Sequence, residues 1–146
     1  MAAEGIMVAV GAVIKDENER VLLVKHRPER GGFWQGKWIC PGGKLMLGER
    51  IEEGIKREVK EETNLEINLT APLTTFDRIV ESEGGTELHV IYINYLAEKA
   101  EGELRPNSDV GEARWASRKD ILDIWEELHE DTRKLFRIAE IVQVGE

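Results

Sequence analysis

The pattern of apolar positions along the chain predicts two β-hairpins. Apolar and β-branched residues run almost without interruption from Met7 to Ile14, which is typical of a strand buried on both faces. After a short polar segment, the apolar run Val21 to Val24 is expected to form the second strand of this hairpin. A second hairpin is expected from Leu73 to Val80 and from Glu87 to Ala97, because Glu83-Gly84-Gly85 between them is a turn signal.

A helix is predicted from Arg50 to Thr63, since Ile51, Ile55 and Val59 recur at helical spacing and would form its packing face. Gly54 lies inside this segment, where glycine costs about 1 kcal/mol relative to alanine. We therefore expect another part of the backbone to approach the helix closely at Gly54.

Shorter elements complete the predicted order. Strand character is found at Lys37–Cys40, Leu65–Leu69 and Ala113–Ala116. A further helix is expected to begin at Ser117, with Ile121 and Leu122 inward, and a C-terminal helix would carry Leu135, Phe136, Ala139 and Val142. This order predicts an α+β fold, an α/β/α sandwich with a mixed β-sheet between helices. Residues 1–146 are expected to form a single domain.

Three glutamates of the predicted helix lie on one strip of its surface. Glu58, Glu61 and Glu62 are spaced i, i+3 and i+4, and like charges at these spacings repel each other. The negative end of the helix dipole is also unfavourable to them. Folding does not require this cluster, but binding of a divalent cation does. The alternative is a solvated charged helix, which the opposite-charge pair of Glu52 and Lys56 would fit.

The segment Gly43–Leu65 resembles the Nudix box, whose pattern is G-x5-E-x7-R-E-U-x-E-E-x-G-U with U an aliphatic residue. The matching positions are Gly43, Glu49, Arg57, Glu58, Val59, Glu61, Glu62 and Leu65. Asn64 stands where the family has glycine, and asparagine also tolerates the left-handed conformation that follows a helix. The resemblance implies the Nudix fold and the hydrolysis of a nucleoside diphosphate linked to a further group X. It also implies Mg²⁺ as cofactor, with Mn²⁺ as a substitute.

The resemblance also implies roles for individual residues. Glu58, Glu61 and Glu62 resemble metal ligands, and the backbone carbonyl of Gly42 resembles a further one. Glu58 is in addition the candidate that orients or deprotonates the attacking water. A fourth acidic ligand is expected from a later loop, with Asp109 slightly favoured over Glu112.

Arg57 is expected to pair with Glu49 and to hold the glutamates in position. An ordinary surface ion pair between Arg57 and Glu53 is the alternative. Two of the histidines are not expected to belong to the site. We expect His26 and His89 to be strand-end or core residues, because no His/Cys cluster with zinc spacing accompanies them.

Substrate contacts are expected from the glycine-rich loop before the box and from its neighbours. Aromatic residues there could stack on a nucleobase, and basic residues could contact phosphates. The aromatic candidates are Phe33, Trp34 and Trp38, and the basic candidates are Arg27, Arg30 and Lys44. Packing in the core or within the loop is the alternative for the aromatic residues, and a solvated position is the alternative for the basic ones. Cys40 is expected to be a small buried residue without a nucleophilic role.

The short chain with an aromatic loop before the box is most similar to MutT-type enzymes, which hydrolyse a nucleoside triphosphate to the monophosphate and pyrophosphate. ADP-ribose pyrophosphatases often carry a proline at a set distance past the box. Here Val80 stands at that distance, and the nearest proline downstream of the box is Pro72. An ADP-ribose or nucleotide-sugar pyrophosphatase therefore remains the alternative, followed by a non-catalytic nucleotide sensor.

Composition narrows the choice of partner. The 146 residues carry a net charge of −9, which argues against a nucleic-acid polymer, since phosphate neutralisation needs a basic surface. A small nucleotide is compatible with this charge, because bound cations supply positive charge locally. We expect no membrane association, since no apolar run approaches the length of a transmembrane helix. The single cysteine favours a cytoplasmic location, and homodimer formation is left open.

Overall fold

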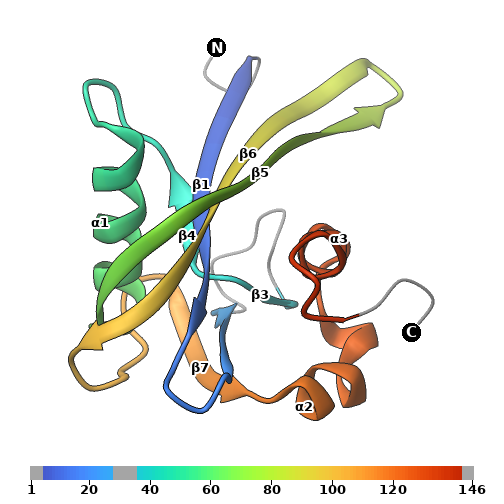
Figure 1. Ribbon diagram of the computed structural model, residues 1–146. Coiled ribbons are helices and arrows are strands. Elements are labelled where there is room, and N and C mark those ends of the chain that lie inside the picture. The colour runs from blue at the N-terminus through green and yellow to red at the C-terminus, as the bar shows by residue number, and fades with distance from the viewer. Residues whose placement is uncertain (1–4, 28–35, 143–146) are drawn as a thin grey trace.

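A seven-stranded mixed β-sheet forms the centre of the computed structural model, which describes residues 5–27 and 36–142 (Figure 1). The strand order is β3-β2-β1-β6-β5, with β4 paired to β1 and β7 paired to β2. The strands are β1 (Ile6–Lys15), β2 (Val21–His26), β3 (Trp38–Ile39), β4 (Gly42–Lys44), β5 (Glu66–Ser82), β6 (Gly85–Glu101) and β7 (Val110–Ala116). β1 runs parallel to β6, whereas the other pairs are antiparallel.

Helices cover both faces of this sheet, as the sequence predicted. They are α1 (Ile51–Thr63), α2 (Arg118–Asp123), the 3₁₀ turn η2 (Trp125–Glu127) and α3 (Glu130–Ile138). Figure 1 shows α1 on one side of the sheet and α2 with α3 on the other. Because side chains of a strand alternate between faces, Val13 packs with Phe136 of α3. Its neighbour Ile14 packs with Ile55 and Val59 of α1.

Helix α1 has the predicted bounds, and its end explains the unusual residue of the box. Asn64 adopts the left-handed conformation with φ 70°, and its backbone N–H donates to the carbonyl of Lys60. Ile51 is 36% exposed, so its expected place on the packing face is wrong. The reason is that the first turn extends beyond the buried cluster. A Cβ on Gly54 would lie 2.7 Å from Leu45 Cδ1, so a side chain and not a backbone approaches there.

The second hairpin is longer than expected. Leu65–Leu69 and Leu73–Val80 were predicted as separate strands, but most of both belongs to the continuous β5. The β5–β6 ladder shifts register on either side of Pro72. A proline without an N–H is tolerated on such an edge strand because irregularities absorb it. Helix α3 ends at Ile138, so Val142 is buried beyond the helix.

None of the helices in the described part of the chain is long and apolar enough to span a bilayer.

Candidate active site

Two glycines bring strand β4 against its neighbours. Gly42 pairs with Gly11 of β1, and a Cβ on Gly42 would lie 2.8 Å from the Gly11 Cα. A Cβ on Gly43 would lie 2.5 Å from the carboxylate of Glu58. Side chains at these positions are therefore excluded, and the bare backbone of β4 forms the surface on which Glu58 rests.

Arg57 joins the loop before α1 to the helix. Its Nε donates to Glu49 Oε2 at 2.5 Å, and its Nη2 donates to Glu49 Oε1 at 3.0 Å and to the Lys44 carbonyl at 3.1 Å. Glu49 Oε1 also accepts from the Met46 N–H at 3.0 Å. The hydrogen bonds from Arg57 lower the pKa of Glu49 to about 2. The pairing of Arg57 with Glu49 that the resemblance implied is therefore present.

The same guanidinium contacts two glutamates of the acidic strip. Arg57 Nη1 donates to Glu58 Oε2 at 2.9 Å and to Glu61 Oε1 at 3.1 Å. Burial raises the pKa of Glu58, and Arg57 opposes this rise, while the charges of Glu61 and Asp109 add to it. These carboxylates are thus close enough to repel each other, and one arginine offsets part of that repulsion.

Glu62 lies deeper than the other two glutamates. It is 4% exposed, and its Oε1 accepts from the Gly42 N–H at 3.1 Å. Its Oε2 lies 3.7 Å from His26 Nε2 at the end of β2. Burial raises the pKa of Glu62 to about 7. His26 is therefore a strand-end residue beside the strip, whereas His89 lies on β6 and contacts Asp77 Oδ2 at 2.9 Å.

The two candidates for a fourth acidic ligand have different positions. The negative charge of Asp109 raises the pKa of Glu58, which places Asp109 near the strip. Its carbonyl accepts from the Arg27 N–H at 2.8 Å. Glu112 is exposed on β7, where it pairs with Lys25 of β2. Position therefore favours Asp109, and its role as a ligand stays a prediction.

The donor set suits a hard divalent cation. Glu58, Glu61, Glu62 and Asp109 offer carboxylate oxygens, which are the ligands that Mg²⁺ prefers. Within residues 5–27 and 36–142, no three acidic, histidine or cysteine side chains already stand as a ready-made metal group. Arg57 lies between Glu58 and Glu61, so these carboxylates would have to turn from the guanidinium to share an ion.

The residues expected to contact the substrate lie in different environments. Trp38 is 7% exposed and belongs to the core between the sheet and α3. Its predicted stacking on a base is therefore wrong, because Trp38 is in strand β3 and its ring fills the core. Phe33, Trp34 and Arg30 lie outside the described residues. Arg27 and Lys44 are both exposed near the strip, and their contact with phosphates stays a prediction.

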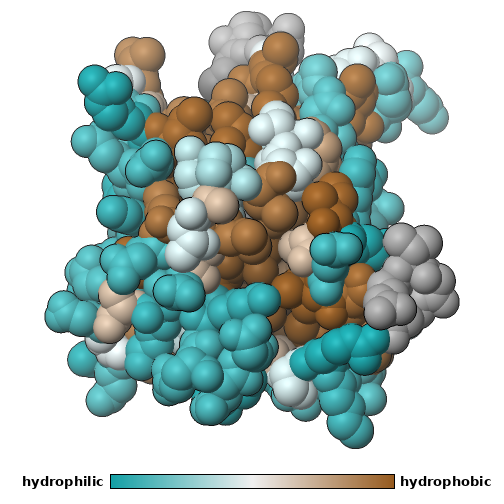
Figure 2. All heavy atoms as spheres, viewed as in Figure 1, coloured by the Kyte–Doolittle hydropathy of each residue, from teal (hydrophilic) through white to brown (hydrophobic). Residues whose placement is uncertain are grey.

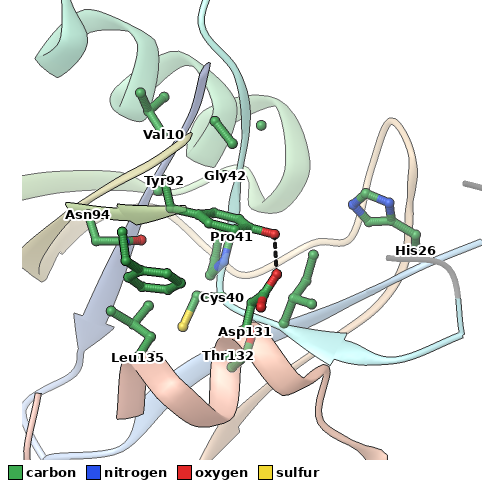
Figure 3. A pocket seen from close by; sticks show the side chains of 15 residues that line it. Val10, His26, Cys40, Pro41, Gly42, Tyr92, Asn94, Asp131, Thr132 and Leu135 are labelled. Atoms are coloured by element: carbon green, nitrogen blue, oxygen red, sulfur yellow. Dashed lines mark hydrogen bonds between the residues drawn. The ribbon is translucent and has the colours of Figure 1, made fainter. Parts of the chain in front are cut away.

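A pocket beside the strip was not predicted from the sequence (Figure 3). Its cavity of ≈ 80 Å³ lies between the sheet and α3, and Gly42 and Gly43 form part of its wall. The other lining residues include Phe76, Tyr92, Asn94, Asp131, Thr132 and Leu135. In the space-filling view, hydrophobic residues gather over the middle of this face, with hydrophilic residues around them (Figure 2). The one available signal was Asn94, a polar residue within the apolar run that forms β6.

The polar wall of the pocket is held by a hydrogen-bond network. Asp131, at the start of α3, accepts from Tyr92 Oη at 2.5 Å and from Arg78 Nε at 2.7 Å. The rings of Phe76 and Tyr92 pack with their centroids 5.1 Å apart. Cys40 also lines the pocket, and burial raises the pKa of its thiol to about 12, so the thiol stays neutral. Hydrogen bonds and ring packing thus hold the side chains of this wall in place, and Cys40 adds no charge to it.

Comparisons with known proteins agree with this geometry. Residues 5–137 match the family model described as NUDIX domain. The nucleoside triphosphatase NudI of Escherichia coli O17:K52:H18 is 32% identical over 123 residues, which cover 80% of this chain and 85% of that protein. The crystal structure of a MutT protein from Methanosarcina mazei Go1 matches with a TM-score of 0.77 at 27% identity, covering 92% of this chain and 93% of that one. A MutT NUDIX hydrolase from Burkholderia pseudomallei matches with a TM-score of 0.77 at 26% identity, covering 95% and 100%. The chain belongs to the Nudix hydrolase family.

Proposed function

We propose that this enzyme hydrolyses a nucleoside triphosphate to the nucleoside monophosphate and pyrophosphate, with Mg²⁺ as cofactor and Mn²⁺ as a substitute. The observation that carries the proposal is one guanidinium, Arg57, which contacts Glu49, Glu58 and Glu61 beside a largely apolar pocket. The similarity to a protein named nucleoside triphosphatase supports the choice of substrate.

The residues proposed to hold the cation are Glu58, Glu61, Glu62, Asp109 and the carbonyl of Gly42. When bound, a divalent cation neutralises phosphate charge and makes water a better nucleophile at neutral pH. The closeness of the carboxylates supports this assignment, since Glu61 and Asp109 both raise the pKa of Glu58. An acidic protein otherwise has little means of attracting a triphosphate.

Glu58 is proposed to accept the proton of the attacking water. In that step the water oxygen bonds to the α-phosphorus, the bond from this phosphorus to the bridging oxygen breaks, and pyrophosphate leaves. Burial moves the pKa of Glu58 upwards, towards the range in which a carboxylate serves well as a general base. Arg57 positions this carboxylate through the hydrogen bond from Nη1. Gly43 lies against the Glu58 carboxylate, and only a glycine at this position leaves room for that carboxylate.

The pocket is proposed to hold the nucleobase. Gly43 lines the pocket and also touches the Glu58 carboxylate. A base between the sheet and α3 would therefore direct its phosphates towards the acidic strip. Largely apolar walls with a few polar groups are typical of sites for such ligands.

The experiment is a panel of ribo- and deoxyribonucleoside triphosphates, ADP-ribose and nucleotide sugars. Each is incubated with the enzyme and Mg²⁺, Mn²⁺ or EDTA, and the products are separated by chromatography. We expect pyrophosphate and a nucleoside monophosphate from at least one triphosphate, and no turnover in EDTA. Release of AMP and ribose 5-phosphate from ADP-ribose alone would replace the proposed substrate. Absence of turnover with every compound, together with tight nucleotide binding, would indicate a sensor instead.

A further inference from the structure

We propose that Asn94 selects the nucleobase by donating a hydrogen bond from Nδ2 to an acceptor atom on the edge of the base. The inference rests on the proposed function, because it assigns the pocket to the base of the substrate. It adds the residue that distinguishes one base from another.

Asn94 is buried in the wall of the pocket. It lies on β6, is 6% exposed, and lines the cavity together with Gly11 of the neighbouring strand. Figure 3 shows its side chain directed from β6 into the pocket. Gly11 of β1 lies beside Asn94, since the two residues are paired and a Cβ on Gly11 would be in ordinary contact with Asn94 Oδ1 at 3.8 Å. The carboxamide is thus held at the wall against which a planar ligand would lie.

The fold leaves the amide nitrogen of Asn94 unused. Its Nδ2 is buried and has no hydrogen-bond partner among the described residues. A buried polar group without a partner destabilises the folded state, and such groups are rare in folded proteins. Val10, Phe76 and Leu135 line the same cavity as Asn94, so a valine or leucine would suit this position of the strand better. A ligand that binds the amide explains why asparagine is present.

The carboxylate of Asp131, which also lines the pocket, already has hydrogen-bond partners within the protein. Asp131 accepts from Tyr92 with one oxygen and from Arg78 with the other. Its own N–H donates to His129 Nδ1 at 3.1 Å. Asp131 therefore fixes the start of α3, whereas the amide of Asn94 is left for the ligand. A site built to hydrogen-bond a substrate group rejects analogues that lack the group much more strongly than an apolar pocket does.

The test compares Asn94→Leu with the wild-type enzyme. The substitution keeps the approximate size of the side chain and removes the amide. The matched control is Asn68→Leu, the same change at an exposed position of β5 that does not line the pocket. For each protein, kcat/KM is measured with the four deoxynucleoside triphosphates and with an abasic deoxyribose triphosphate. Dissociation constants are measured with the corresponding α,β-methylene triphosphates, which resist hydrolysis.

We expect Asn94→Leu to lower kcat/KM for the preferred nucleotide by about 10- to 100-fold, which is the usual range for one lost hydrogen bond in a binding site. The loss should appear mainly in KM and in the dissociation constant. The preference among bases should flatten, the abasic triphosphate should be unaffected, and Asn68→Leu should behave as the wild type. If Asn94→Leu does not fold, Asn94→Ser is used, with the same flattening expected.

Two results separate the inference from the proposed function. Unchanged base preferences in a folded Asn94 variant that still hydrolyses triphosphates would overturn the role of Asn94 alone. An equal loss for the abasic triphosphate would do the same. If the wild-type enzyme hydrolyses no triphosphate, the proposed function fails, and base-selective binding of the methylene analogues still decides the role of Asn94.

Discussion

Arg57 and Glu49 are joined by two hydrogen bonds, from Nε to Oε2 at 2.5 Å and from Nη2 to Oε1 at 3.0 Å. The remaining nitrogen, Nη1, contacts Glu58 and Glu61. One planar group thereby fixes a loop carboxylate relative to two helix carboxylates. A lysine carries the same charge but lacks this planar fork. The role of Arg57 is therefore one of positioning, in addition to its charge.

Replacement of Arg57 by lysine should lower kcat by about 10- to 100-fold. A loss of this size is expected when a reacting group is slightly misplaced. The melting temperature should change little, because Arg57 is partly exposed. The measurement is a double-mutant cycle with Glu49→Gln under Mg²⁺. We expect the double variant to be no slower than the slower single variant, since both changes break the same link. Losses that multiply would show that Arg57 and Glu49 act independently.

Replacement of Glu58 by glutamine should remove most activity, with a fall in kcat of about 10²- to 10⁴-fold, the typical contribution of a general base. The metal-free protein should be as stable as the wild type or more stable. The reason is that burial and the charges of Glu61 and Asp109 disfavour the ionised carboxylate. Activity and thermal unfolding in EDTA are the two measurements. The control is Glu52→Gln, an exposed position on the same helix. A variant that loses activity because it no longer folds would contradict the prediction.

Local sequence signals predicted much of the fold. Strands β1 and β2 were recognised because their apolar runs are short and are separated by polar turns. The helix was recognised because its apolar residues repeat at helical spacing. The match to the Nudix box predicted the contact of Arg57 with Glu49, two residues only eight positions apart in the sequence. These features depend on neighbours in the sequence, so the sequence alone was informative.

The pocket depended on contacts between distant segments. Phe76, Asn94 and Asp131 lie on β5, β6 and α3 and meet only after the sheet has formed. No spacing along the chain relates them. Trp38 was misassigned for a similar reason, since an aromatic residue beside a glycine-rich loop can face either the solvent or the core. Because Trp38 lies in β3, which pairs with β2, its side chain is buried in the core.

Replacement of Gly43 by alanine should impair catalysis through Glu58. The added Cβ would lie 2.5 Å from the Glu58 carboxylate, so this carboxylate must move. We expect kcat with Mg²⁺ to fall by at least about 10-fold, as is usual when a catalytic group is displaced. Gly84→Ala is the control, because a Cβ at the tip of the β5–β6 hairpin meets nothing within 4 Å. A Gly43→Ala enzyme with the wild-type kcat would show that the position of Glu58 is not critical.

Glu62 should make the stability of the metal-free protein depend on pH. Burial raises its pKa from 4.5 to about 7, so between these values the folded state keeps a proton that the unfolded state has released. The free energy of unfolding must then fall as the pH rises through this window. The expected loss from this group is on the order of 3 kcal/mol.

Urea unfolding in EDTA, at a series of pH values from 4.5 to 8 that spans this window, measures the effect. The free energy of unfolding of Glu62→Gln should depend less on pH than that of the wild type, because an amide is never ionised. At the highest pH values this variant should be more stable than the wild type. Glu52→Gln should follow the wild type, since it leaves the buried carboxylate in place. Parallel curves for the wild type and Glu62→Gln would mean that Glu62 is already ionised in the folded protein at low pH. Its burial would then be fully compensated by the Gly42 N–H and His26, which lie 3.1 and 3.7 Å from its oxygens.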